Sequence, residues 1–294
     1  MFTGNRYLDV VKLNNFDKFT AWATENAFEL NERLRVEESL RPSIPREFWI
    51  PGFCALCGRT TEFWSTFEYG MTSNSGTIIP NYREHLICKY CGFSNRVRAS
   101  IQMFVQEFRP GVNQPIYITE QLTRTFRWMM GHYSAVSGSE YLPGKSAFGR
   151  TVRGIRNEDL QALSWPDGQF DFILSFDVLE HVPDAPACFR EMFRCLRRGG
   201  RVLFTAPTTL SRYETEVRAA LQPSGDVIHF KEPEYHGGNR QDASKGTLCY
   251  RYFGWDILRQ LEQIGFSNAE MWLYWSRDLG YIGGTQNAIV ACKE

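Results

Sequence analysis

The chain lacks an excess of charge of either sign. Its 294 residues carry 33 basic and 33 acidic side chains, and no long region departs far from neutrality. Nucleic acids and anionic membranes are bound mainly through basic patches, so the overall charge does not call for either partner. We therefore expect no membrane partner and regard nucleic acid as disfavoured. The oligomeric state has no signature in the sequence.

Long apolar runs are missing as well. No run approaches the ~18 residues that a membrane span needs, and the N-terminal residues 1–15 lack the apolar core of a signal peptide. We therefore expect a cytoplasmic protein. In a reducing compartment eight cysteines do not form a disulfide framework, so paired cysteines indicate metal ligands or redox dithiols.

The apolar content of 43% is enough for a full core, and three regions can be told apart along the chain. Residues 15–40 have apolar side chains at helical spacing, which predicts an amphipathic helix that packs on the main body or caps a pocket. The proline-rich stretch 41–52 ends that helix. The expected domains are a helical segment (1–50), a zinc ribbon (51–100) and a larger α/β domain (101–294).

Two cysteine pairs predict a metal site. "FCALCGRTTEF" (53–63) and "HLICKYCGFSNRVRASI" (85–101) each hold a Cys-x-x-Cys turn followed by glycine. Such turns aim two thiolates at one point, so the pairs together predict a tetrahedral S₄ zinc site formed by Cys54, Cys57, Cys88 and Cys91. With four protein ligands the zinc has no open position, which indicates a structural role. Two separate redox dithiols, or His85 in place of one cysteine, are the alternatives.

The remainder of the chain alternates short apolar strands with helical patterns. This alternation predicts a doubly covered parallel sheet, which binds ligands beyond the carboxyl ends of its strands. The expected helices are 122–133, 185–200 and 254–266, and a further short strand is expected at 152–156. The main expected strands are 115–120, 134–141, 170–177, 200–207, 269–275 and 287–293.

Acidic residues follow three of these strands in succession. Glu120 ends the first strand, Glu140 ends the second, and Asp159 follows the third. The interval between the first two is what a β-α-β unit needs to present a carboxylate to the hydroxyls of a ribose. Asp159 could accept a hydrogen bond from the amine of an adenine. Three acids predict a nucleoside ligand without phosphates, or else they are solvated loop carboxylates.

The stretch "NEDLQALSWPDGQFDFILSFDVLEHVPDAPACFREMFRCLRRGGRVLFTAP" (157–207) resembles the middle of class I S-adenosylmethionine-dependent methyltransferases of the type 11-like group. With the cysteine pairs, the chain is similar to bacterial methyltransferases that carry an N-terminal zinc ribbon. The resemblance implies a Rossmann-like seven-stranded sheet whose last strand is antiparallel, with S-adenosylmethionine as cofactor. It implies ribose binding by Glu140, adenine binding by Asp159 and Leu160, and Phe176 and Asp177 beside the methionine and its methyl. The implied cofactor residues are Glu120, Gly138, Glu140, Asp159, Leu160, Phe176 and Asp177.

One departure from the family concerns glycine. The family has a glycine-rich loop after its first strand, whereas this chain has "YITEQLTRTF" (117–126). Glu120, nearby backbone amides and Arg124 could take over the contacts with the methionine moiety. Alternatively, the pocket has decayed and the chain is a catalytically silent binding module.

Methyl transfer to a hydroxyl requires removal of a proton, and histidine is suited to that step. His181 in "LEHV" and His236 in "EYH" are the candidate catalytic bases, and His229 is a further one. Tyr235 and Glu234 could hold the acceptor. The sequence thus favours O-methylation, less so N- or C-methylation, of a small molecule or sugar-derived metabolite. An RNA methyltransferase whose zinc lobe contacts phosphates is the alternative, through Arg83, Lys89, Arg96 and Arg98.

Overall fold

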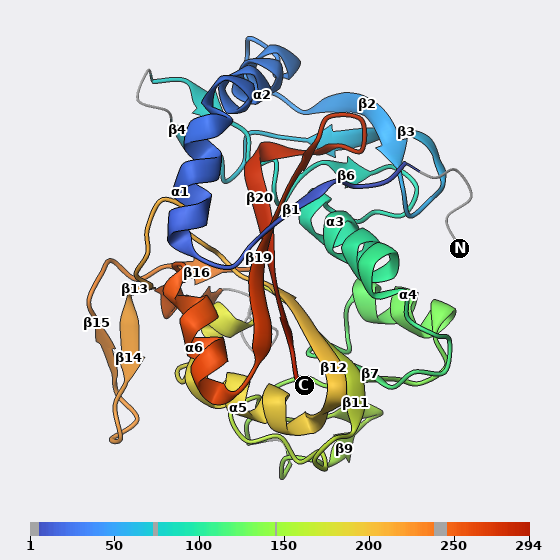
Figure 1. The fold of residues 1–294 in the computed structure, drawn as a ribbon, viewed down its shortest axis with the longest axis vertical. Helices are drawn as coiled ribbons and strands as arrows, with labels where there is room; N and C mark the ends of the chain where they lie inside the picture. Colours follow the sequence, from blue (N-terminus) through green and yellow to red (C-terminus); the bar gives the residue numbers. More distant parts are fainter. Residues whose placement is uncertain (1–5, 73–75, 145, 238–245) are drawn as a thin grey trace. The chain divides into compact units, whose positions relative to one another are not determined.

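The computed structural model describes residues 6–72, 76–144, 146–237 and 246–294, which form two compact units. The first unit contains residues 1–13, 17–110 and 272–288, and the second contains residues 14–16, 111–271 and 289–294. Strands β19 (Ser267–Ser276) and β20 (Tyr281–Cys292) are neighbours in one sheet and have residues in both units (Figure 1). None of the helices in the described part of the chain has the length and apolar character that crossing a bilayer requires.

A seven-stranded sheet has the strand order β1-β19-β20-β12-β11-β7-β8. The pairs β7–β8, β7–β11 and β11–β12 are parallel, and β20 is antiparallel to β12. This mixed sheet with helices confirms the predicted Rossmann-like α/β fold and its antiparallel last strand. Besides β19 and β20, this sheet contains β1 (Val10–Leu13), β7 (Ile116–Ile118), β8 (Val136–Gly138), β11 (Phe170–Phe176) and β12 (Leu196–Thr205).

The strand expected at 152–156 is not a single strand. Residues 151–156 form a hairpin of β9 (Thr151–Val152) and β10 (Ile155–Arg156). Arg153 and Gly154 have φ values of 52° and 80°, a left-handed turn that reverses the chain. After the hairpin, Asn157 forms a parallel bridge with Glu140, which follows β8.

The core of the second unit surrounds β11, all seven residues of which are buried. Helix α5 (Ala185–Cys195) begins at Asp184, whose carboxylate accepts from the Ala187 amide at 2.9 Å. It ends five residues before the predicted end, because residues 196–200 already belong to β12. Helices α4 (Arg124–His132) and α6 (Asp256–Ile264) lie within the predicted ranges.

Short strand pairs follow β12 in the second unit, and these, together with a 3₁₀ turn, carry much of the candidate site. The 3₁₀ turn η2 (Leu179–His181) follows β11. The pairs are β13 (Glu216–Val217) with β18 (Arg251–Tyr252), β14 (Ala219–Leu221) with β15 (Val227–His229), and β16 (Tyr235–His236) with β17 (Thr247–Leu248).

The predicted helix over 15–40 is two helices, α1 (Phe16–Glu25) and α2 (Ala27–Leu40). They divide at Asn26, whose side-chain amide donates to the Trp22 carbonyl at 2.8 Å and so competes with the helical pattern. The first unit also holds helix α3 (Asn95–Met103), the π-helical turn η1 (Phe104–Phe108) and the strands between α2 and α3. These strands are β2 (Phe48–Cys54), β3 (Arg59–Ser65), β4 (Met71–Thr72), β5 (Ile78–Ile79) and β6 (Ile87–Cys88), with β2-β3-β6 forming one sheet.

Candidate functional site

Parallel strands β7, β8 and β11 end at one edge of the sheet, and acidic residues follow each of them. Glu120 follows β7, Glu140 follows β8, and Asp177 follows β11 directly. The Glu140 carboxylate accepts hydrogen bonds from the backbone amides of Gln121 and Leu122, at 2.9 and 2.6 Å. Glu140 therefore anchors the glycine-free turn between β7 and α4, a role that the sequence did not indicate.

Gly138 packs directly under this turn. A Cβ atom at this position would lie 2.5 Å from the Phe126 ring and 2.7 Å from the Glu120 carbonyl oxygen, closer than real atoms approach. A side chain at position 138 would thus displace the turn. The turn between β7 and α4 therefore requires a glycine at the end of β8, although the turn itself contains none.

Asp159 and Leu160 lie just beyond the bridge to β8. The Asp159 carboxylate accepts from the backbone amide and the side-chain amide of Gln161, at 2.9 and 3.1 Å, and Leu160 is buried. The preceding residue, Glu158, is fully buried, with Arg156 donating to it at 2.6 Å and the Ser164 amide at 2.9 Å. Glu158 is thus a structural carboxylate, and nothing in the sequence distinguished its role from that of the adjacent Asp159.

Asp177 ends β11 in a left-handed conformation. Its φ is 52°, which is rare for a residue other than glycine and is often found where function requires strain. Its carboxylate accepts from the Thr205 hydroxyl at 2.7 Å, and its amide donates to the Thr205 carbonyl at 3.0 Å. Phe176, one residue earlier, is buried. The end of β11 is therefore tied to the end of β12.

Three side chains converge beyond β11. Ligand atoms of Glu180, His181 and His236 all lie within 4.8 Å of one another. The His181 Nε2 atom is 3.6 Å from Glu180 Oε1, and the two imidazole rings meet edge to face, with centroids 5.4 Å apart. His181 and His236 thus lie in one group, which the sequence did not indicate. His229 is exposed on β15 and does not belong to this group.

Hydrogen bonds fix both imidazoles. His181 Nδ1 lies 2.8 Å from the Leu248 carbonyl oxygen, which can only accept, so Nδ1 carries the proton. His236 Nε2 lies 2.8 Å from a Glu234 carboxylate oxygen. Glu234 also accepts from the Tyr252 hydroxyl and from Arg218, at 3.0 Å from the latter. Burial lowers the pKa of His181, which favours the neutral ring.

The turn η2 is held by a buried cation. The Arg251 guanidinium donates to the carbonyl of Leu179 at 3.1 Å and also to those of Val182 and Pro183. The Tyr250 amide donates to the Glu180 carbonyl at 2.7 Å. Burial lowers the pKa of Arg251. Arg251 is a positioning residue that sequence reasoning missed, because no motif surrounds it.

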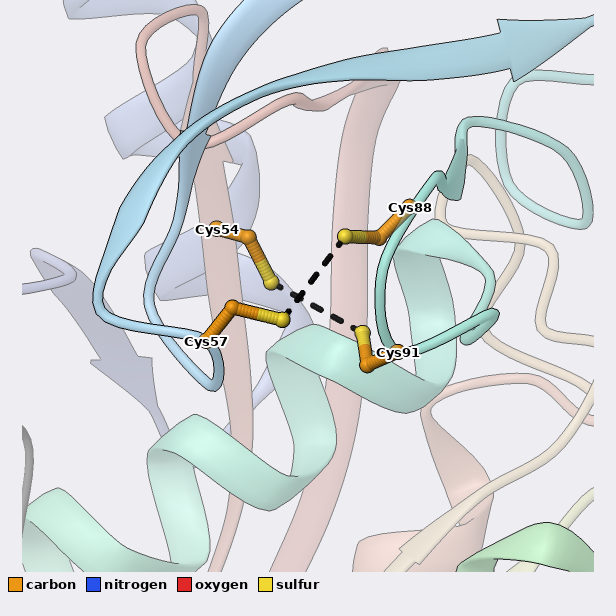
Figure 2. A group of neighbouring side chains, drawn as sticks. All are labelled: Cys54, Cys57, Cys88 and Cys91. Atoms are coloured by element: carbon orange, nitrogen blue, oxygen red, sulfur yellow. Dashed lines mark hydrogen bonds between the residues drawn. The ribbon is translucent and has the colours of Figure 1, made fainter.

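The four predicted zinc ligands meet at one point of the first unit. Figure 2 shows their sulfur atoms pointing toward one another across the two knuckles. Cys54 and Cys91 are 3.8 Å apart, and Cys57 and Cys88 are 3.9 Å apart. Four sulfurs at zinc–sulfur bonds of about 2.3 Å would be roughly 3.8 Å apart in a tetrahedron. The convergence of the two pairs argues against separate dithiols.

The knuckles have the backbone that the sequence predicts. Gly58 and Gly92 have φ values of 64° and 65°, which glycine adopts without strain. Burial and the neighbouring thiols raise the pKa of the Cys57 thiol. His85 is not among the potential ligands that the described residues bring together here.

The basic residues proposed for RNA contact are engaged within the first unit. Arg98 is fully buried and donates to the carbonyls of Leu279, Leu86 and Gly280. It therefore cannot reach a phosphate, which contradicts that part of the alternative hypothesis. The other three form ion pairs: Arg83 and Arg96 with Glu84, and Lys89 with Glu62.

A cavity of about 410 Å³ lies within the first unit. Its lining includes Trp22, Arg33 and Trp275, and it contains none of the predicted cofactor or catalytic residues. The Arg33 guanidinium lies over the Trp275 ring, 5.1 Å from its centroid, and pairs with Glu29. The cavity is therefore separate from the strand-end site of the second unit.

Comparison with known proteins identifies a methyltransferase domain. Residues 123–204 match the family described as "Methyltransferase domain". The matched segment runs from the start of α4 to the end of β12 and contains Glu140, Asp159 and Asp177, as well as Glu180 and His181.

Individual relatives match over limited lengths. Malonyl-[acyl-carrier protein] O-methyltransferase of Halorhodospira halophila is 30% identical over 126 residues, 38% of this chain and 41% of that protein. Phosphoethanolamine N-methyltransferase of Triticum aestivum is 43% identical over 47 residues, 16% of this chain and 9% of that protein. The chain thus spans about two fifths or less of these relatives. The crystal structure of Burkholderia thailandensis 1,6-didemethyltoxoflavin-N1-methyltransferase has a TM-score of 0.42 at 14% identity, covering 67% of this chain and 77% of that one.

Proposed function

We propose that the protein transfers a methyl group from S-adenosylmethionine to a hydroxyl oxygen of a small molecule or sugar-derived metabolite. The observation that carries this proposal is the match of residues 123–204 to a methyltransferase domain, with strand-end carboxylates and the Glu180, His181 and His236 group at one edge of its sheet. Two partial relatives are named as methyltransferases, one acting at oxygen on a malonyl group carried by a protein and one acting at nitrogen on phosphoethanolamine.

The strand-end residues suit the cofactor. Carboxylates at the ends of β7, β8 and β11 would repel a phosphate, and they can accept hydrogen bonds from the hydroxyls and amine of an uncharged nucleoside. In this proposal Glu140 binds the ribose, Asp159 the adenine amine and Leu160 the ring. Phe176 and Asp177 border the methionine end. When bound, S-adenosylmethionine supplies a methyl group already activated on a sulfonium.

The acceptor hydroxyl is placed at the His181 and His236 pair. Because the Leu248 carbonyl holds the proton of His181 on Nδ1, Nε2 keeps its lone pair. The Nε2 atom of His181, with the His236 ring beside it, can accept the acceptor's proton. The preference for oxygen over nitrogen rests on this arrangement, since a neutral amine needs no base.

The cysteine group supports a structural zinc in the same proposal. Four sulfurs at tetrahedral spacing leave no position for substrate. Cys54 and Cys88 also belong to the buried core cluster of the β2-β3-β6 sheet, so a metal there would tie the knuckles to that core. We expect the zinc to stabilise this part of the first unit without taking part in methyl transfer.

Calorimetry with S-adenosylhomocysteine tests the proposal on the full chain. We expect binding in the micromolar range, and a loss of at least tenfold in affinity for Glu140→Ala, with Glu214→Ala as the exposed acidic control. Absence of heat at high protein concentration would favour a silent binding module. Strongly salt-dependent binding of structured RNA would favour the RNA alternative. Methyl transfer to candidate metabolites is then followed by mass spectrometry of the product.

A further inference from the structure

Glu180, His181 and His236 form a group of potential metal ligands that is separate from the four cysteines. Glu180 comes from the turn after β11, and its side chain is only 1% exposed. His181 is the next residue, and His236 comes from β16. Two elements that are 55 residues apart thus bring two imidazoles and one carboxylate to one point.

The surroundings of both histidines resemble those of metal-bound imidazoles. A ligating histidine usually donates its second nitrogen to a carbonyl or carboxylate, which fixes the ring and makes it a better ligand. His181 donates to the Leu248 carbonyl, and His236 is bound to the Glu234 carboxylate. Glu234 is itself held by Arg218 and Tyr252.

The backbone of the group is also preorganised. Arg251 binds three carbonyls of the segment 179–183, and the Tyr250 amide binds the carbonyl of Glu180. The turn that presents Glu180 and His181 is therefore fixed before any ligand arrives. Preorganisation of this kind lowers the entropic cost of binding.

We infer that Glu180, His181 and His236 bind a divalent cation of the first transition row, such as Mn²⁺. Two nitrogen ligands and one oxygen ligand suit such ions, whereas Mg²⁺ and Ca²⁺ prefer oxygen alone. Three protein ligands leave coordination positions open, unlike the closed S₄ site of the cysteines. The inference rests on the proposed function, because the open positions are assigned to the methyl acceptor.

A bound cation would determine which class of acceptor the site takes and how the acceptor loses its proton. A hydroxyl bound to a divalent cation has a lowered pKa, so it loses its proton to solvent more readily than a free hydroxyl does. The acceptor oxygen then forms a bond to the methyl carbon, while the electron pair of the methyl–sulfur bond stays on sulfur. The acceptor is therefore a molecule with a hydroxyl, and a second oxygen beside it, as in a vicinal diol or a catechol, would strengthen its binding.

Titration of the zinc-loaded full chain with Mn²⁺ tests the site. Electron paramagnetic resonance measures the free aqueous ion, so bound Mn²⁺ appears as lost signal. Hard Mn²⁺ does not compete for four thiolates. We expect one bound Mn²⁺ per chain, with affinity reduced at least about tenfold by E180Q and by H236A. Because Glu180 is buried, H236A, at a half-exposed position, provides the variant that keeps the test valid if E180Q fails to fold.

Matched controls are E232Q and H229A, which change the same residue types at exposed positions outside the group and should leave the Mn²⁺ affinity unchanged. Absence of Mn²⁺ binding, or equal affinity in E180Q, H236A and the controls, overturns the inference. Calorimetry with S-adenosylhomocysteine on the same samples separates the two proposals. Cofactor binding without Mn²⁺ leaves the methyltransferase proposal standing with histidine as base. Mn²⁺ binding without cofactor binding supports the metal site and counts against the methyltransferase.

Discussion

The buried guanidinium of Arg251 donates to the carbonyl oxygen of Leu179 at a distance of 3.1 Å, across 72 residues of sequence. The same group reaches the carbonyls of Val182 and Pro183. One cation from β18 thus satisfies three backbone acceptors in the segment that carries Glu180 and His181.

Replacement of Arg251 by lysine should therefore lower both stability and activity. Lysine keeps the charge but cannot reproduce the planar fork of donors, so at least one buried carbonyl loses its partner. We expect a loss of about 1–3 kcal/mol in unfolding free energy. Urea unfolding followed by tryptophan fluorescence measures this loss. Arg259→Lys, at an exposed position of α6, is the control and should change the midpoint little.

The change Cys88→Ser tests the metal assignment of the knuckles. Serine is a poor ligand for zinc, so we expect the bound zinc to fall well below one equivalent and the first unit to lose stability. Elemental analysis and thermal unfolding provide the two measurements. Cys292→Ser removes a thiol outside the cluster and should retain the zinc. Full zinc content in Cys88→Ser would contradict the four-ligand site.

Replacement of Asp159 by alanine should weaken S-adenosylhomocysteine binding. If the carboxylate accepts from the adenine amine, its loss leaves a buried donor unpaired, at a cost of about 1–3 kcal/mol. Calorimetry measures the change, with Asp226→Ala in the β14–β15 turn as control. Unchanged affinity would place the adenine elsewhere. Circular dichroism should show the same spectrum for Asp159→Ala as for the unchanged protein, because the substitution should leave the fold intact.

Glu37 gives a prediction for the first unit. This buried carboxylate accepts from the backbone amides of Gly283 and Gly284, at 2.8 and 2.9 Å, and from the Trp275 indole at 2.7 Å. Glu37→Gln keeps the shape but loses the charge, and its amide nitrogen cannot accept. We expect a destabilisation of about 1–3 kcal/mol in urea unfolding. The adjacent exposed change Glu38→Gln should be close to neutral; a similar effect of both changes would refute the role of the buried carboxylate.

The main strands of the sheet were largely predictable, because β-branched and aromatic runs such as residues 170–176 are unambiguous when they are buried on both faces. The predicted bounds of helices and strands were wrong where a local hydrogen bond or turn ends the element. Asn26 divides the predicted helix through a side-chain bond to Trp22, and the turn at Arg153 and Gly154 converts a predicted strand into a hairpin.

The parts of the candidate site that could be predicted are those whose residues form a recognisable spacing in the sequence. The two Cys-x-x-Cys pairs are such a spacing, and their four sulfurs do converge, whereas no spacing indicated that His181 and His236 meet. The supporting residues have no local pattern. Glu234, Leu248 and Arg251 reach the site through the short strand pairs after β12, whose register depends on long-range packing. Arg98 illustrates the same difficulty, since no sequence signal distinguishes a buried arginine from a surface one.

The membership of residues 272–288 in the first unit has a consequence for biosynthesis. Most of that unit is synthesised before residues 111–271 of the second unit, but its segment 272–288 is synthesised after them. Domains generally fold as units during translation, so this one must wait for more than 160 intervening residues. Until then, surfaces of the first unit that residues 272–288 cover stay open to chaperones.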